Sequence, residues 1–109
     1  MSVENQGGDG THPLADIDRV VHGPARLMVM TSLYVLESAD FVFLVNMTGL
    51  TWGNLSSHLT RLEEAGYVDI EKKVAGRRVN TMVSMTDAGR AAFKAYKRQM
   101  QEVLDELPD

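Results

Sequence analysis

The sequence predicts an α+β fold that is mostly helical, with helices on both sides of a two-stranded hairpin. Apolar residues recur at helical spacing over residues 51–65 and 86–107. Apolar and acidic residues alternate over residues 68–71, as in a half-buried strand. A partner strand over about 79–85 follows the glycine-containing tip at 75–78. Together these patterns predict one domain in which a hairpin lies between two amphipathic helices.

The helix expected over residues 51–65 has two unlike faces. Leu55, Leu59 and Leu62 lie at i, i+4 and i+7 and can be buried together. Thr51 suits the N-cap and Gly66 the C-terminal end, where helices often adopt a left-handed conformation. The opposite face carries short, polar or cationic side chains, which suit contact with base edges and phosphates. These are Gly53, Asn54, Ser57, Thr60 and Arg61. Such a helix followed by a basic hairpin predicts a winged helix-turn-helix.

Two helices are expected before this motif. A short helix over about 14–22 has apolar residues on one side and is ended by Gly23-Pro24. Pro24 suits the first position of the next helix, at about 24–37. That helix is nearly all apolar, so we expect it to be covered on most sides and to serve a partner subunit as well.

Cap and turn residues define the remaining helices. Asp40 is the expected N-cap of the first helix of the helix-turn-helix, over 41–47. Gly49 supplies the unusual backbone angles of the tight turn that follows. Thr86 is expected to cap the long last helix, over about 86–107.

The segment from Asp40 to Arg90 contains a series of short motifs in a fixed order. They are Thr48-Gly49-Leu50-Thr51, Gly53-Asn54-Leu55-Ser56, His58-Leu59, Leu62 to Val68, Gly76-Arg77-Arg78, Thr81 and Thr86-x-x-Gly89-Arg90. In these motifs the segment resembles winged-helix transcriptional regulators related to the MarR and ArsR groups, above all a small single-domain prokaryotic family. The resemblance covers roughly residues 14–107. It implies a homodimeric, sequence-specific repressor or other regulator of transcription that binds a double-stranded DNA operator, and the choice between repressor and activator stays open. Val79 stands where the family usually has proline after the basic pair, which leaves the wing backbone less restricted.

The charge distribution is compatible with DNA binding despite a net charge of −4. Residues 1–50 hold six acids against two arginines, whereas residues 72–98 hold eight basic residues against Asp87. Acids return after Gln99. A basic middle between acidic ends fits one DNA-facing surface. The other interpretation is that these charges only solvate exposed faces.

The candidate DNA contacts come from the predicted recognition helix and the hairpin. Asn54 and Arg61 can each make paired hydrogen bonds to a base edge, and Ser57 can reach a base or a phosphate. Arg77 and Arg78 at the tip suit phosphates or the minor groove. The alternative is that all of them are simply solvated. The full predicted set is Thr51, Trp52, Gly53, Asn54, Ser56, Ser57, His58, Arg61, Lys73, Arg77 and Arg78.

Two residues of this set have open alternatives. Trp52 could stack on a sugar or contact a thymine methyl, or it could pack on the preceding helix. His58 lies at the flank of the leucine face, where it could touch a phosphate or be a satisfied, half-buried histidine.

The last helix and the apolar helix over 24–37 are predicted to join two subunits. A two-fold dimer would read a roughly palindromic operator, with half-sites about one helical turn apart. The predicted dimerisation residues are Leu27, Met30, Tyr34, Phe93, Tyr96, Met100, Val103 and Leu107. The seven methionines are adaptable core filling, or they line a ligand pocket at the subunit interface. Whether a small-molecule effector exists stays open.

Several classes of function are excluded or disfavoured. The chain has no cysteine, which removes disulfides, thiolate nucleophiles and cysteine-ligated metals. His12, His22 and His58 are far apart, so no metal site is expected. No serine elbow, Walker loop or dinucleotide loop is present, and we expect neither enzymatic activity nor a cofactor.

The chain's organisation is expected to be simple. Residues 1–12 are a polar, glycine-rich tail without the pattern of a signal peptide, and residues 13–109 form the domain. No run approaches the ~18 apolar residues of a membrane helix, so a cytoplasmic protein without membrane contact is expected. The alternative function is a winged-helix adaptor that contacts proteins without binding DNA, suggested by the acidic ends and the long last helix.

Overall fold

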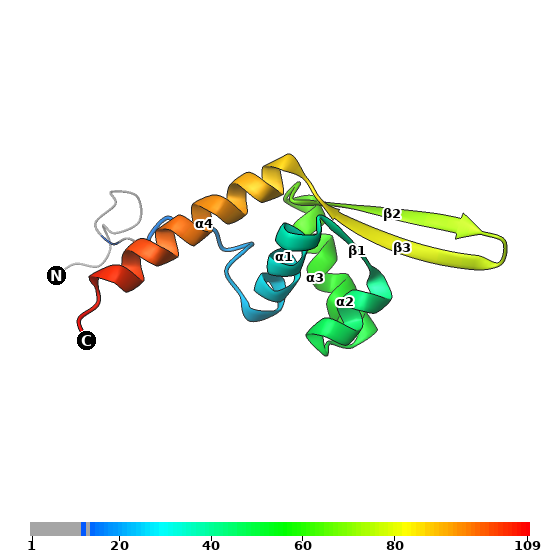
Figure 1. Cartoon of the computed structure of the whole chain (residues 1–109), viewed down its shortest axis with the longest axis horizontal. Coiled ribbons are helices and arrows are strands. Elements are labelled where there is room, and N and C mark those ends of the chain that lie inside the picture. Colours follow the sequence, from blue (N-terminus) through cyan, green and yellow to red (C-terminus); the bar gives the residue numbers. More distant parts are fainter. Residues whose placement is uncertain (1–11, 13) are drawn as a thin grey trace.

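The computed structural model describes residue 12 and residues 14–109, which form four α-helices and a three-stranded antiparallel sheet (Figure 1). The predicted α+β, mostly helical fold class is confirmed. The predicted tail over residues 1–12 lies outside the described residues, apart from His12. The elements are α1 (Pro24–Leu36), β1 (Ser38–Asp40), α2 (Phe41–Thr48), α3 (Trp52–Glu64), β2 (Val68–Ala75), β3 (Arg78–Met85) and α4 (Asp87–Glu106).

The helix-turn-helix consists of α2, a short turn and α3. Asp40 caps α2, because its side chain accepts a hydrogen bond from the Phe43 N–H at 2.7 Å. Gly49 ends α2 with φ 73°, in the left-handed region that favours glycine. Thr51 caps α3 by accepting from the Asn54 N–H at 3.1 Å. All three predicted roles are confirmed.

The end of α3 is a Schellman motif. The Tyr67 N–H donates to the Leu62 carbonyl and the Gly66 N–H donates to the Glu63 carbonyl, each at 2.9 Å. Gly66 has φ 82°, as the motif requires. The leucine face of α3 is enclosed, since Leu55, Leu59 and Leu62 are at most 2% exposed. The chain thus enters β2 in a fixed direction from a firmly anchored α3.

The wing is the hairpin of β2 and β3, which projects from the helices in Figure 1. Its register runs from Val68 opposite Met85 to Ala75 opposite Arg78. The two-residue tip begins with Gly76 at φ 64°, where a type II′ turn places glycine. Every residue from 71 to 80 is exposed. The distal wing therefore makes no contribution to the core and is available for a partner.

The sheet has a third strand that the sequence analysis missed. β1 pairs antiparallel with β3, with Ala39 opposite Val83, and the strand order is β1-β3-β2. Ala39 is 7% exposed and belongs to the core. A three-residue strand is too short for alternation to be visible. The predicted two-stranded wing is thus the free part of a three-stranded sheet.

Residues 14–22 do not form the predicted helix and instead make turns. The Asp18 carboxylate accepts from the N–H groups of Val20 and Val21, at 2.8 and 3.1 Å. An aspartate that binds nearby amides in this way competes with helix formation. Val21 is fully buried, so this segment still contributes to the core.

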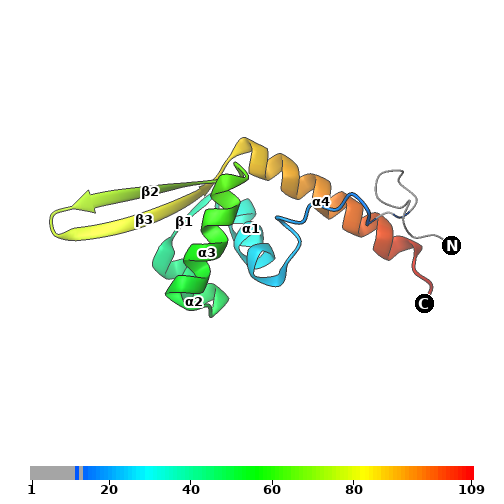
Figure 2. The ribbon, with the colours of Figure 1, turned by 180° about the vertical axis from the view of Figure 1, so that it is seen from behind.

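The last helix, α4, is capped by Thr86, whose side chain accepts from the Gly89 N–H at 2.9 Å. Figures 1 and 2 show α4 and the wing extending in opposite directions from the central helices. Phe93 and Tyr96 pack against the core, whereas Leu104 and Leu107 are 56% and 60% exposed. The second half of α4 therefore carries apolar side chains that the chain itself does not cover.

Candidate nucleic-acid interface

The polar face of α3 is exposed. Asn54, Ser57 and Arg61 are exposed, at i, i+3 and i+7 along the side opposite the buried leucines. Neighbouring positions of the predicted set are exposed as well: Thr51, Trp52, Gly53 and Ser56. The Thr51 hydroxyl is occupied in capping, as described above. This face can approach a duplex without displacing any part of the chain.

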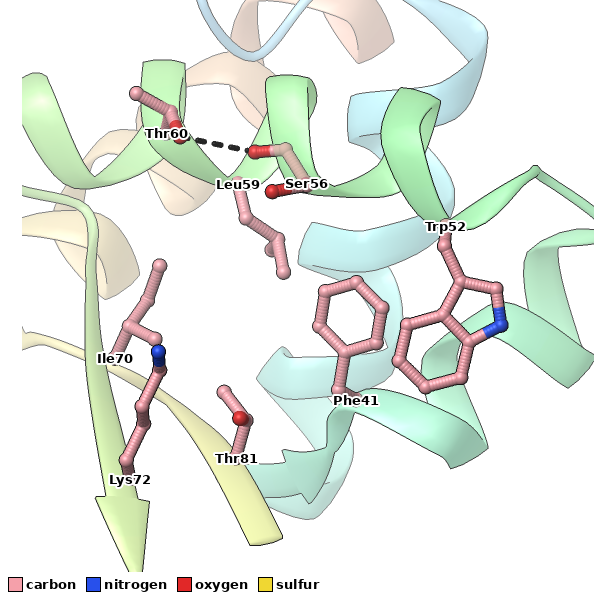
Figure 3. Close-up of a pocket in the computed structure, with 8 residues that line it drawn as sticks. All are labelled: Phe41, Trp52, Ser56, Leu59, Thr60, Ile70, Lys72 and Thr81. Atoms are coloured by element: carbon pink, nitrogen blue, oxygen red, sulfur yellow. Dashed lines mark hydrogen bonds between the residues drawn. The ribbon is translucent and has the colours of Figure 1, made fainter. Parts of the chain in front are cut away.

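Trp52 packs on the preceding helix and remains accessible at the same time. Its ring stacks on Phe41, the first residue of α2, with ring centroids 4.6 Å apart and an interplanar angle of 24° (Figure 3). It is nevertheless 60% exposed. The packing alternative is thus observed, and a broad aromatic surface still faces outward beside the recognition face.

His58 joins α3 to the start of α1. Its Nδ1 lies 3.1 Å from the Arg26 guanidinium, and the Arg26 Nε–H donates to the Val20 carbonyl at 2.6 Å. Because arginine can only donate, Nδ1 must accept, and the proton of the neutral ring is on Nε2. Burial lowers the pKa of His58, and the charges of Arg26 and Arg61 lower it further. His58 is therefore a half-buried neutral histidine, and Arg26 is a partner that the sequence pattern did not reveal.

The basic residues of the wing divide between its faces. Lys72 lies opposite Thr81 and Lys73 opposite Asn80, so the two lysines point to opposite sides of the hairpin. Arg77 forms the tip with Gly76, and Arg78 begins β3. All four cations are exposed. The wing can hence present positive charge to phosphates on more than one side.

A groove of about 270 Å³ separates α3 from the wing (Figure 3). Leu59, Ile70 and the Phe41–Trp52 stack give it apolar walls, and Lys72 extends along β2 toward α3. The lining residues are Phe41, Trp52, Ser56, Leu59, Thr60, Ile70, Lys72 and Thr81. Sequence reasoning did not find this groove, because its residues come from α2, α3 and both strands of the wing.

The predicted dimerisation residues fall into two groups. Met30 is fully buried and Tyr96 is 6% exposed, so both belong to the core of one subunit and cannot meet a partner. Tyr96 also shares a hydrogen bond with His22 Nδ1 at 2.8 Å. The other predicted residues are half-buried or exposed: Leu27, Tyr34, Phe93, Met100, Val103 and Leu107. The nearly uniform apolar pattern of α1 gave no indication of which side faces inward.

Neither a cluster of metal ligands nor a membrane-spanning helix occurs in the described part of the chain. Within residues 14–109 and His12, no group of three His, Asp or Glu side chains could hold a metal ion. In the same residues, no helix is long and apolar enough to cross a membrane.

Comparison with known proteins agrees with this geometry. An uncharacterized protein of Methanocaldococcus jannaschii is 40% identical over 78 residues, which is 72% of this chain and 85% of that protein. A transcriptional regulator homologue from Pyrococcus horikoshii is 33% identical with a TM-score of 0.76, covering 81% of this chain and 89% of that one. The structure of reduced AbfR bound to DNA shares the fold, at 22% identity and a TM-score of 0.64, over 76% of this chain and 55% of AbfR.

These comparisons confirm the predicted resemblance to winged-helix transcriptional regulators and the prediction of a DNA-binding protein rather than an enzyme. Residues 25–104 match the family described as winged helix DNA-binding domain. That match spans the helix-turn-helix, the wing and most of α4. The chain therefore belongs to the winged helix DNA-binding domain family.

Proposed function

We propose that this chain is a homodimeric repressor that binds a specific double-stranded DNA operator. α3 enters the major groove, and the wing lies against the adjacent backbone or minor groove. The observation that carries the proposal is that the exposed side of α3 and the basic wing border one groove, with Ser56 on one side and Lys72 on the other. A single duplex can therefore contact both elements at once.

In this proposal the polar face of α3 reads the sequence. Asn54 and Arg61 each have side chains that can pair with two atoms of a base edge, Asn with adenine and Arg with guanine. Ser57 lies between them on the same face. All three side chains are exposed and therefore accessible to a duplex.

The wing supplies attraction that is independent of sequence. Lys73, Arg77 and Arg78 are exposed and stand on a hairpin that reaches away from the helices. Phosphate neutralisation by such residues releases counterions, so it makes affinity fall steeply with salt. Residues 72–80 contain four basic residues and no acidic one, so the local charge of the distal wing is positive.

Dimerisation is proposed through the outer half of α4 and the open side of α1. Leu104 is exposed near the end of α4 and Leu107 just beyond it, and Val35 and Leu36 are 75% and 50% exposed at the end of α1. Large apolar side chains left uncovered on these two elements would be buried against a second copy. A second copy related by a two-fold axis would cover them and set two α3 helices for a palindromic operator. Repression then follows because the bound dimer occupies DNA that the transcription machinery needs.

The wing assignment is tested by changing Arg77 and Arg78 to alanine together. A dimer would lose four phosphate contacts, so the slope of log affinity against log salt should fall by about 3.6, at about 0.9 per contact. The matched control is Lys97→Ala with Arg98→Ala, which removes the same charge from exposed positions on α4. If the two double variants lose equal affinity, the wing has no special role in binding.

The proposed role of α3 in base recognition is tested with Asn54→Ala. We expect the variant to lose about 1–3 kcal/mol of discrimination for the operator. Its affinity for random duplex should stay unchanged, since the wing cations remain. Equal loss on both DNAs would assign Asn54 to the backbone rather than to a base.

The competing function is a protein adaptor that does not use DNA. It predicts no salt-dependent retention of duplex by the wild-type chain, together with a stable heteromeric complex. If the Arg77/Arg78 variant no longer retains duplex DNA and the Lys97/Arg98 control still does, the adaptor function is excluded.

A further inference from the structure

We propose that Trp52 contributes to operator specificity by packing its indole ring against the 5-methyl group of a thymine in the major groove, and that Phe41 holds the ring in place. The contact rests on the proposed function, because it is made with a duplex that α3 is proposed to read. It adds a chemical group of the operator, a methyl group, that the hydrogen bonds of Asn54 and Arg61 do not recognise.

Trp52 lies at the end of α3 that is expected to reach the base edges. It is the first residue of the helix, directly after the Thr51 cap and two residues before Asn54. In helix-turn-helix proteins the N-terminal residues of the recognition helix contact base edges. Side chains of a helix tilt toward its N-terminus, and Figure 3 shows the indole beside Phe41 at this end of α3. The indole is therefore next to the side chains that are proposed to read bases.

The indole ring is held by the chain and exposed at the same time. It stacks on the Phe41 ring, and Phe41 in turn packs against the hydrophobic core. Trp52 nevertheless keeps most of its surface accessible. Because the stack restricts the ring before DNA is bound, little side-chain entropy is lost when the ring meets a partner. The stack thus supplies an apolar surface that is already in position.

The chemistry of the major groove decides which group this surface fits. Among the base edges, the groups exposed there are hydrogen-bond donors and acceptors, except for the 5-methyl group of thymine. An indole ring pressed against a donor or acceptor would remove its water without replacing the hydrogen bond, which costs free energy. Against a thymine methyl group both surfaces are apolar, and their burial is favourable. We therefore expect Trp52 to select thymine at one position of each half-site.

The competing contact is with a deoxyribose of the DNA backbone, which also offers apolar carbon atoms. Every nucleotide carries the same sugar, so this contact would raise the affinity for all sequences alike. The place of Trp52 at the start of α3, close to Asn54, favours the base edge. The two contacts differ in one measurable respect, which is whether binding depends on the thymine methyl group.

The test replaces single thymines of the selected operator by deoxyuridine, which pairs as thymine does and lacks only the methyl group. Affinities of the wild-type protein are compared by fluorescence anisotropy. We expect one thymine position in each half-site, related by the palindrome, at which the replacement weakens binding about fourfold, as for one methyl group lost from a buried contact. Equal affinity at every position would overturn the contact. A small, equal loss at every thymine would also overturn it, because that is an effect of duplex shape.

Variants assign the methyl group to Trp52. Trp52→Ala should bind the thymine and deoxyuridine duplexes equally, and Trp52→Phe should keep part of the preference because an apolar ring remains. The matched control is Asn54→Ala, which should keep the fourfold ratio although its affinity for the operator is lower. Trp52 is mostly exposed, so we expect Trp52→Ala to fold, and the scan with wild-type protein needs no variant. A preference for thymine that persists in Trp52→Ala would refute the contact.

The positioning role of Phe41 is measured with Phe41→Leu, which keeps an apolar side chain against the core and removes the aromatic stack. We expect a smaller ratio between the affinities for thymine and deoxyuridine duplexes, although Trp52 is still present. A lower affinity for both duplexes with an unchanged ratio would show that Phe41 affects only the stability of the fold.

The same measurements separate the thymine contact from the proposed function. A wild-type chain that selects an operator and does not respond to the loss of thymine methyl groups contradicts the contact at Trp52 alone. A wild-type chain that retains no duplex contradicts the proposed function, and the contact at Trp52 fails with it.

Discussion

Two glycines in first turns of helices should respond in opposite ways to alanine. Gly89 lies in the first turn of α4, where an added Cβ would be 2.1 Å from the Tyr67 carbonyl oxygen and 2.9 Å from its carbon. Gly53 lies in the first turn of α3, where an added Cβ would meet nothing within 4 Å. Both have ordinary helical backbone, so only the surroundings differ.

The expected magnitudes follow from these contacts. Alanine is favoured over glycine in a helix by up to about 1 kcal/mol, and Gly53→Ala should gain part of that. Gly89→Ala would have to push α4 away from Tyr67, which costs about 1–3 kcal/mol by overpacking. The shift would also strain the hydrogen bonds from Thr86 to the Tyr67 carbonyl at 3.0 Å and to the Gly66 carbonyl at 2.6 Å, each contributing about 1 kcal/mol. We expect a net loss of about 2 kcal/mol.

Urea unfolding followed by circular dichroism gives both values, at one fixed protein concentration because a dimer would link stability to concentration. In thermal unfolding, the loss corresponds to a decrease in Tm of roughly 8–16 °C for a domain of this size. If Gly89→Ala is as stable as Gly53→Ala, α4 and Tyr67 do not approach each other as closely as described, and the reasoning fails.

Three further predictions concern stability, pH and assembly. Glu37 ends α1 with φ 71°, so Glu37→Gly should raise the free energy of unfolding by about 0.5–1 kcal/mol, whereas Glu64→Gly in the last turn of α3 should lower it. A lower free energy of unfolding for Glu37→Gly in urea would show that the backbone at Glu37 is not strained. The pKa of His58 in the folded chain is held below its usual 6.5, so the unfolded chain binds the proton more readily. The free energy of unfolding should therefore fall as pH decreases below about 6.5. If the His58→Gln variant keeps the same pH dependence of unfolding, His58 is not its cause. Leu104→Asp with Leu107→Asp should shift sedimentation equilibrium from dimer to monomer, and an unchanged dimer would move the interface elsewhere.

The parts of the fold that could be predicted are those encoded over a few neighbouring residues. Thr51, Asp40 and Thr86 each accept a hydrogen bond from an amide three residues ahead, so a cap can be identified from the local sequence. The buried leucines of α3 share one face because of their spacing alone. Gly66 was correctly placed at the end of that helix, since the left-handed conformation needs a residue without Cβ strain.

The parts that could not be predicted depend on residues far apart in the chain. β1 forms because Ala39 pairs with Val83 in β3, and a three-residue segment is too short for this pairing to be predicted from its sequence. Residues 14–22 looked helical, but the Asp18 carboxylate binds two nearby amides and also accepts a hydrogen bond from the Tyr67 hydroxyl. That bond and burial raise the pKa of Tyr67 to about 12.

In the candidate site, too, locally encoded features could be predicted and features formed by distant residues could not. The exposed face of α3 and the exposed wing could be predicted, because each lies on a single element with its own pattern. The groove could not, since Phe41, Lys72 and Thr81 meet only in the folded chain. Met30 was assigned to an interface because α1 is apolar on nearly every side, and only the packing reveals that this side chain faces the core.

The central claim, that α3 and the wing of a dimer read a DNA operator, is tested most directly by selection from a random-sequence duplex library. Duplexes retained by the protein over a range of salt concentrations are sequenced, and their affinities are measured by fluorescence anisotropy. We predict an enriched, roughly palindromic motif with half-sites about one helical turn apart, and an affinity that falls steeply with salt. No enrichment and no retention at low salt would contradict the claim and favour the protein adaptor.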